Sequence, residues 1–167
     1  MAVKNPKDLF VMLLSDLRQR EEKTADVLGE WSKAVDNQDV KEALESRVFL
    51  KNQTINSLDR CFKLIGEQPV KINDRIHDIY VEDCRRELNE IQSPIAKSLY
   101  ILAKARHLMH SRIGEYVALT AMADITGHYG VGVLLEACMA DKLAFVERTR
   151  RLVRHMVQSE VGELMAA

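Results

Sequence analysis

Apolar residues recur along most of the chain at spacings of three and four residues, which is the pattern of helices that bury one face. The first apolar stripe covers residues 9–35. Similar stripes follow at about 39–65, 94–126 and 130–157, and a shorter one lies at about 72–90. The pattern therefore predicts four long helices and one short helix.

Capping residues mark where these helices begin and end. Asn5-Pro6 and Ser93-Pro94 each place an N-cap side chain before a proline at the first helical position. Gly66 is a left-handed helix stop, because glycine adopts that backbone conformation without strain. We expect a single domain over residues 1–167 whose helices span about 6–35, 39–65, 72–90 (the crossover helix), 94–126 and 130–157.

The connections between the four long helices have unequal lengths. The joins near residues 37 and 128 are short, so each should link two antiparallel neighbours. The connection from Gly66 to Ser93 is long and contains the short helix. Two hairpins joined by one long connection is the topology of ferritin-like bundles. The sequence thus predicts an all-α, ferritin-like four-helix bundle, in which two antiparallel hairpins are joined by a long crossover containing a short helix.

All four long stripes are apolar near their ends and polar at mid-length. Arg20 and Thr24 interrupt the first stripe, and Arg47 and Lys51 interrupt the second. Because unpaired charges are costly to bury, a charged layer inside the bundle must contain metal, water or ion pairs. Di-metal bundles use a Glu-x-x-His motif on two of their helices, and no Glu of this sequence has a His three residues later. This argues against a standard di-iron oxidase.

Composition and charge narrow the list of partners. Only 7 Gly and 3 Pro are present and aromatic residues make up 5%, which favours helices. The formal net charge of −1 gives no general electrostatic reason to expect a nucleic acid or a membrane as a partner. The longest apolar run, Leu9–Leu14, is too short for a signal peptide or a membrane span. Cys61, Cys84 and Cys138 lack zinc-site spacing, so we expect reduced thiols in a cytoplasmic protein.

Several short pieces of the sequence resemble one known family. They are, in chain order, Asp8-Leu9-Phe10, Asp16-Leu17 with Glu21, Phe62–Pro69, Ile113 with Tyr116 and Leu119, Gly127-His128 and Leu134-Leu135. Over about 6–157, the chain is similar to the small bacterial ferritin-like stress proteins that include YciE and YciF. The resemblance implies a bacterial protein with a stress-related role that forms a homo-oligomer, namely a dimer.

Most of the metal-ligand positions that this resemblance implies carry other residues here. Acids or a histidine remain at Glu21, His110 and Asp141, whereas bases stand at Arg47, Arg112 and Lys142. We expect no cofactor; the alternative is a residual iron or manganese site formed by the three remaining ligands. Our hypothesis is that the bases belong to an internal ionic layer, whose members would be Glu21, Arg47, Arg112, Asp141 and Lys142.

Three functions stay open at this point. The first, which we expect, is a non-enzymatic ferritin-like protein. The second is a residual iron- or manganese-binding protein with peroxide or oxidase chemistry. The third is a helical interaction module that uses the crossover helix or the basic run at 148–155. The basic run is also explained by its place near the end of a helix, where cations interact favourably with the helix dipole. His107 and His110 lie on one helix face, but no third metal ligand lies at a suitable spacing, so we expect ordinary histidines there.

Overall fold

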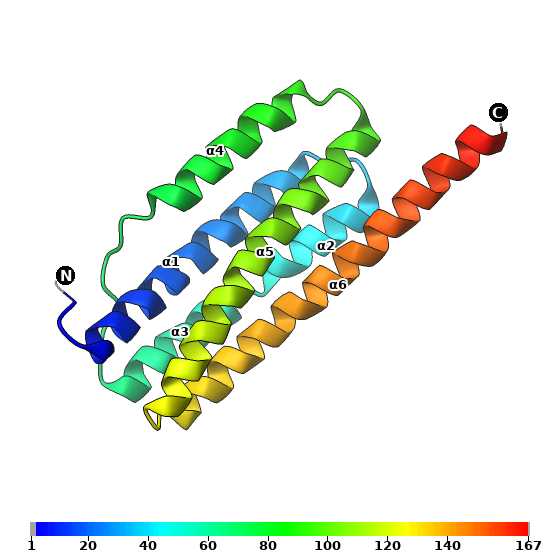
Figure 1. Cartoon of the computed structure of the whole chain (residues 1–167). Helices are drawn as coiled ribbons and strands as arrows, with labels where there is room; N and C mark the ends of the chain where they lie inside the picture. Colours follow the sequence, from blue (N-terminus) through cyan, green and yellow to red (C-terminus); the bar gives the residue numbers. More distant parts are fainter. Residues whose placement is uncertain (1–2, 167) are drawn as a thin grey trace.

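The computed structural model describes residues 3–166, which form six helices (Figure 1). They are α1 (Pro6–Lys33), α2 (Gln38–Phe49), α3 (Lys51–Ile65), α4 (Arg75–Glu90), α5 (Pro94–Ile125) and α6 (Tyr129–Ala166). Asn5, Asn37 and Ser93 cap the starts of α1, α2 and α5, since each side chain accepts a hydrogen bond from the backbone amide three residues later. Gly66 ends α3 with a φ of 70°, which is the left-handed stop that the sequence predicts.

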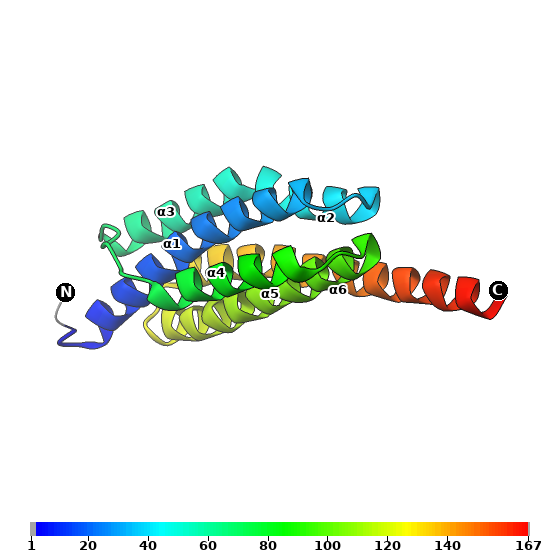
Figure 2. The same ribbon diagram turned by 90° about the horizontal axis from the view of Figure 1, so that it is seen from above.

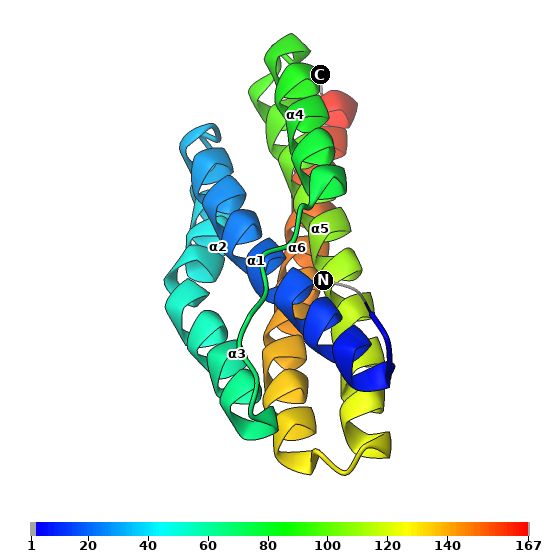
Figure 3. The same ribbon diagram turned by 90° about the vertical axis from the view of Figure 1, so that its left-hand side faces the viewer.

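The helices form two antiparallel hairpins that lie side by side (Figures 1 and 2). In one hairpin α1 pairs with α2 and α3, and in the other α5 pairs with α6. The crossover carries α4 along one side of the bundle, beside the first half of α5 (Figure 3). Three residues of α4 are buried: His77, Val81 and Cys84. This arrangement confirms the predicted all-α bundle of two hairpins joined by a long crossover.

The helix expected at 39–65 is interrupted at Leu50, which separates α2 from α3. Kinks and breaks usually occur at proline or glycine, and neither residue lies within this segment. Nothing in the sequence therefore marks the interruption. The crossover helix also begins later than expected, at Arg75, because the side chain of Asp74 accepts a hydrogen bond from the amide of His77 and caps it there.

The helix expected to end near residue 157 continues to Ala166. Figure 1 shows this last part of α6 extending beyond the other helices. The segment after residue 157 contains no proline and a single glycine, so nothing in it stops a helix that is already formed from propagating. Although α6 has 38 residues, none of the helices within residues 3–166 is apolar enough over a sufficient length to cross a membrane.

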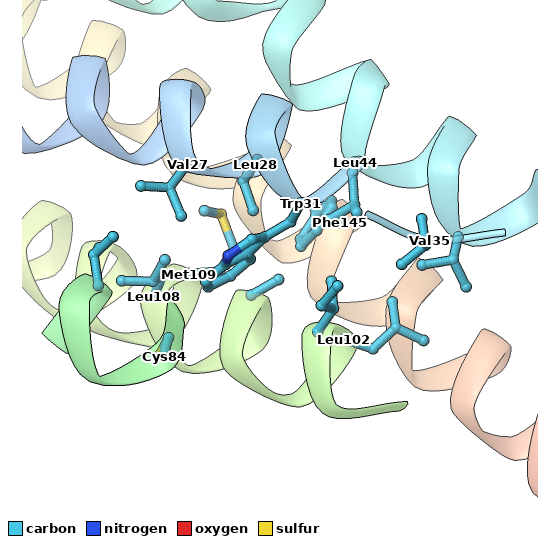
Figure 4. Close-up of a cluster of buried hydrophobic side chains, with 14 of the residues drawn as sticks. Val27, Leu28, Trp31, Val35, Leu44, Cys84, Leu102, Leu108, Met109 and Phe145 are labelled. Atoms are coloured by element: carbon cyan, nitrogen blue, oxygen red, sulfur yellow. The ribbon is translucent and has the colours of Figure 1, made fainter. Parts of the chain in front are cut away.

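The core consists of two hydrophobic clusters along the bundle axis. One cluster includes Trp31, whose side chain is 1% exposed and lies among Leu28, Met109 and Phe145 (Figure 4). The other lies toward the start of α1 and contains, among others, Phe10, Leu14, Leu17, Leu58, Tyr116 and Leu135. The two clusters draw on the same hairpins at different heights, and polar side chains lie between them.

Candidate functional site: a buried charged layer

The polar layer between the two hydrophobic clusters has buried members on five helices. They are Glu21 and Thr24 on α1, Arg47 on α2, Thr54 on α3, Arg112 on α5 and Lys142 on α6, and none is more than 6% exposed. These residues lie on the inward faces of their helices. On α6, for example, Lys142 continues the buried series of Leu135 and Cys138 at helical spacing. The layer is therefore part of the packed interior.

Glu21 and Lys142 form an ion pair in this layer. Lys142 Nζ lies 2.8 Å from Glu21 Oε1, and the two side chains are 0% and 6% exposed. Nζ also donates to the backbone oxygen of Cys138 at 3.4 Å and lies 4.8 Å from the centroid of the Tyr116 ring, within cation–π range. Burial lowers the pKa of Lys142, and the Glu21 carboxylate opposes this shift. A protein ammonium group thus sits directly against the retained acid.

Arg47 is a second buried cation beside this ion pair. Its side chain is almost fully buried, and Nε and Nη1 have no hydrogen-bond partner within residues 3–166. Arg47 lines a small cavity together with Glu21, Thr24 and Thr54. The guanidinium group therefore approaches the charged layer without a direct protein acceptor for these two nitrogens.

A second charged cluster lies between α1, α5 and the crossover. Arg20 contacts three carboxylates, Asp16 at 2.9 Å, Asp74 at 2.9 Å and Glu115 at 2.5 Å. Arg112 Nη1 lies 3.3 Å from the other carboxylate oxygen of Glu115. Burial raises the pKa of Glu115, and the two arginines oppose that shift. Ion pairs thus connect the bundle to the start of α4.

His77 is a buried residue of α4 that lies beside this charged cluster. Neither ring nitrogen has a hydrogen-bond partner in the described part of the chain. Burial lowers the pKa of His77 to about 4, and Arg112 on α5 and Lys23 on α1 act in the same direction. Asp74 and Asp78 oppose the shift. The imidazole is consequently neutral in the folded protein near neutral pH.

We expect His77 to reduce stability as the pH falls from about 6.5 toward 4. In that range the unfolded chain binds a proton at His77 that the folded chain does not, so stability present above pH 6.5 is lost, by up to about 3 kcal/mol. Urea unfolding at several pH values measures this slope. As the pH falls over this range, the wild type should lose stability relative to the His77→Leu variant, and equal slopes in the two proteins would contradict the assignment.

The comparison with this variant is needed because other groups titrate nearby. Burial raises the pKa values of Asp16 and Glu115. These carboxyls therefore bind protons more readily in the folded state, which stabilises the protein as the pH falls. The pH dependence of the wild type alone would combine the two opposing effects.

The structure brings together only part of the predicted site. Glu21, Arg47, Arg112 and Lys142 are buried in the layer, whereas Asp141 is half-buried and His110 is exposed. Asp141 directly precedes Lys142, and one residue turns a helix by about 100°, so both side chains cannot face the same interior. Lys142 holds the inward position, and Asp141 is displaced toward the edge of the bundle.

These residues do not fit a di-metal centre. Such a centre needs several carboxylates and imidazoles around two cations. Glu21 instead faces an ammonium group at 2.8 Å, and the neighbouring buried side chains of Arg47 and Arg112 are cationic. Within residues 3–166, no group of three or more His, Cys, Asp or Glu side chains could hold a metal ion. The retained acid Glu21 is thus paired with a lysine in this structure.

Sequence reasoning missed the cluster around Arg20. Asp74 and Glu115, two of its partners, are 54 and 95 positions away in the chain. Helical periodicity places a side chain on a face but does not specify which charge of another helix meets it. One local signal was available, because an aspartate in the long polar connection is a typical N-cap for the crossover helix.

Comparisons with known proteins agree with the fold. The family model described as a domain of unknown function (DUF892) matches residues 5–162. Protein YciF of Escherichia coli (strain K12) is 24% identical over 148 residues, which cover 86% of this chain and 87% of YciF.

Two solved structures extend the comparison to three dimensions. The E. coli stress protein YciF is 19% identical with a TM-score of 0.87, and the match covers 93% of this chain and 99% of that structure. YcfI from Rhodopseudomonas palustris is 23% identical with a TM-score of 0.84, over 89% and 94% of the two chains. At these identities the structures show a shared fold.

Proposed function

Because the chain belongs to the DUF892 family and shares its helical fold with the E. coli stress protein YciF, we propose that it is a non-enzymatic ferritin-like protein with a stress-related role. In this proposal an internal ionic layer occupies the height at which ferritin-like bundles build a di-metal centre. The protein then acts through its surface, as a cytoplasmic homodimer. The dimer and the stress-related role rest on its resemblance to bacterial relatives.

The observation that carries the non-enzymatic part is the buried contact between Glu21 and Lys142. Two unit charges about 4 Å apart attract by about 4 kcal/mol at an effective dielectric constant of 20. Desolvation of both groups offsets most of this attraction, so the pair contributes little net stability relative to two apolar residues. The ion pair then serves to fix the register of α1 against α6, because a shift of either helix would leave both charges unpaired.

The test of this proposal is the amount of metal that the protein retains. We expect the purified chain, stripped with chelator, loaded with Fe(II) without oxygen or with Mn(II), and desalted, to hold well below one metal ion per chain. The Arg112→Glu variant should behave in the same way, because Arg47 and Lys142 would still place positive charge in the layer. Elemental analysis by mass spectrometry gives the stoichiometry.

Ala118→Glu is a matched control, since it introduces the same carboxylate on an exposed position of the same helix. Stoichiometric metal in the wild type would reject the non-enzymatic proposal and favour the residual iron or manganese protein. Stoichiometric metal in Arg112→Glu alone would show that one base is enough to block an otherwise complete site.

One observation favours an interaction module as a second candidate. Arg151 and Arg154 are exposed on the second half of α6, where the helix still packs against the bundle through Met156. Exposed arginines on a helix offer a surface for an acidic partner. This function is compatible with the ionic layer, because the two features lie in different parts of the molecule.

A further inference from the structure

We propose that the cavity beside Arg47 binds one small inorganic anion of halide size, such as chloride, inside the bundle. Glu21, Thr24, Arg47, Lys51 and Thr54 supply the polar part of its lining. The inference deepens the proposed ionic layer and rests on it, since it assumes that ions other than metals balance the charge there.

The local charge balance calls for an additional negative charge. Arg47 and Lys142 are buried cations, and Glu21 is the buried acid that contacts Lys142. Lys51 also lines the cavity, but Asp26 pairs with it at 2.6 Å. Among the residues that the structure describes, these contacts leave the charge of Arg47 without a direct counterion. Because an uncompensated buried charge is strongly unfavourable, a bound anion would offset part of the cost of burying Arg47.

The hydrogen-bonding groups around the cavity are mainly donors. Arginine and lysine side chains have no acceptor atom, and threonine hydroxyls can donate. Arg47 Nε and Nη1 and the hydroxyl of Thr24 are buried without a partner among the described residues. Glu21 is the one lining carboxylate, and it already contacts Lys142. A monatomic anion can accept hydrogen bonds from several of these donors, whereas a cation would be repelled by Arg47.

The interruption at Leu50 brings the start of α3 beside the cavity. Lys51 and Thr54, from the first residues of α3, line it, and no side chain caps the start of this helix. The first amides of a helix lack intrahelical acceptors and commonly bind anions. The end of α2 adjoins the same point and weakens the dipole effect, so the buried guanidinium of Arg47 remains the principal recognition group.

The size of the cavity selects among anions. The space inside the cavity that the centre of a water molecule could occupy is about 10 Å³. This is about the space that one water molecule needs. A halide ion is larger than water, so the lining must move outward to admit it, whereas phosphate or sulfate adds four oxygen atoms and would not fit. The geometry therefore points to chloride or bromide.

Thermal unfolding in sodium chloride and in sodium gluconate at equal ionic strength tests the inference. Chloride should raise the Tm along a saturating curve, because a ligand that binds only the folded state stabilises it by mass action. Gluconate is too large for the cavity and should give no such curve. A crystal soaked in sodium bromide should show one anomalous peak in the cavity, in contact with Arg47.

Arg47→Met should lose the chloride dependence of the Tm, whereas Arg60→Met, at an exposed arginine of α3, should keep it. If Arg47→Met does not fold, Thr54→Val should require more chloride for half of the effect, and the bromide map of the wild type remains decisive. Equal melting curves in chloride and gluconate, with no anomalous peak, would overturn the halide site and leave the ionic layer intact. Stoichiometric metal after loading would overturn the ionic layer itself.

Discussion

The Lys142→Met variant is expected to unfold with a free energy about 3–5 kcal/mol below that of wild type. The substitution keeps most of the side-chain volume but removes the ammonium group that lies 2.8 Å from Glu21. A buried carboxylate is then left without its counterion. For a chain of 167 residues, the loss corresponds to a Tm roughly 10 °C lower. Thermal and urea unfolding monitored by circular dichroism would measure both quantities.

A double-mutant cycle separates the ion pair from ordinary packing. Glu21→Leu alone should also destabilise the protein, because it leaves Lys142 as an unpaired buried cation. Glu21→Leu combined with Lys142→Met should recover most of the stability, since a buried pair can be replaced by apolar residues at little net cost. Lys63→Met, at an exposed position of α3, is the control and should change stability by less than about 0.5 kcal/mol.

The outcome of this cycle distinguishes two accounts of the layer. Strong coupling between the two sites supports an ion pair whose partners depend on each other. Additive losses would instead mean that Glu21 and Lys142 are stabilised by separate contacts, for example by Arg47 or the Tyr116 ring. In that case the contact would not fix the register of α1 against α6.

Much of the architecture follows from local sequence patterns. Periodicities of three and four residues, together with caps such as Asn5 and Ser93, predict the helices and their starts. Short joins and one long connection then predict two hairpins and a crossover. These signals act over a few residues, so one sequence is enough to recognise them.

The sequence also predicts the mid-bundle polar layer, but not all of its members. The predicted layer included both Asp141 and Lys142, whereas the structure buries Lys142 and leaves Asp141 half-buried. A shift of one position changes direction by about 100°, and apolar neighbours on both sides left the centre of the stripe ambiguous. The residue types in the sequence predict that the layer is charged. The packing of α6 against three other helices determines which of its side chains are buried in that layer.

The contacts of Arg20 lie beyond what such patterns can predict. Arg20 occupies an interrupted stripe, yet its side chain is directed toward the crossover and α5, where it meets Asp74 and Glu115. The path of the crossover determines this meeting. Because that path depends on the whole fold, only the structure reveals that Arg20 connects three segments.

The Arg20→Met variant is expected to lose about 3–5 kcal/mol of stability at neutral pH. Asp16, Asp74 and Glu115 would then lie close together without the cation that they share. The side chain of Asp74 is 1% exposed, so water cannot easily replace the arginine there. Chemical unfolding gives the total loss. Faster hydrogen exchange in Arg75–Glu90, measured by mass spectrometry, would show that the crossover helix in particular is loosened.

Arg18→Met is the matched control for this experiment. Arg18 lies on the same helix and pairs with Asp59 at 2.6 Å, but the two side chains are 27% and 36% exposed. Solvent screens such a pair, so its loss should cost less than about 1 kcal/mol and leave exchange in α4 unchanged. Equal losses in the two variants would show that arginine packing on α1, and not the shared contact with three carboxylates, determines the effect.

The pH dependence of Arg20→Met provides an independent check on its cause. Although burial alone would raise the pKa of Asp74, hydrogen bonds from Arg20 and from the amide of His77 lower it in the wild type. Without Arg20, the three carboxylates repel one another and their pKa values rise. Protonation at lower pH then removes the repulsion, so the stability deficit of the variant should shrink as the pH falls from 7 toward 5. A loss of packing alone would give a deficit that does not change with pH, because no proton uptake would differ between the folded and unfolded states of the variant and the wild type.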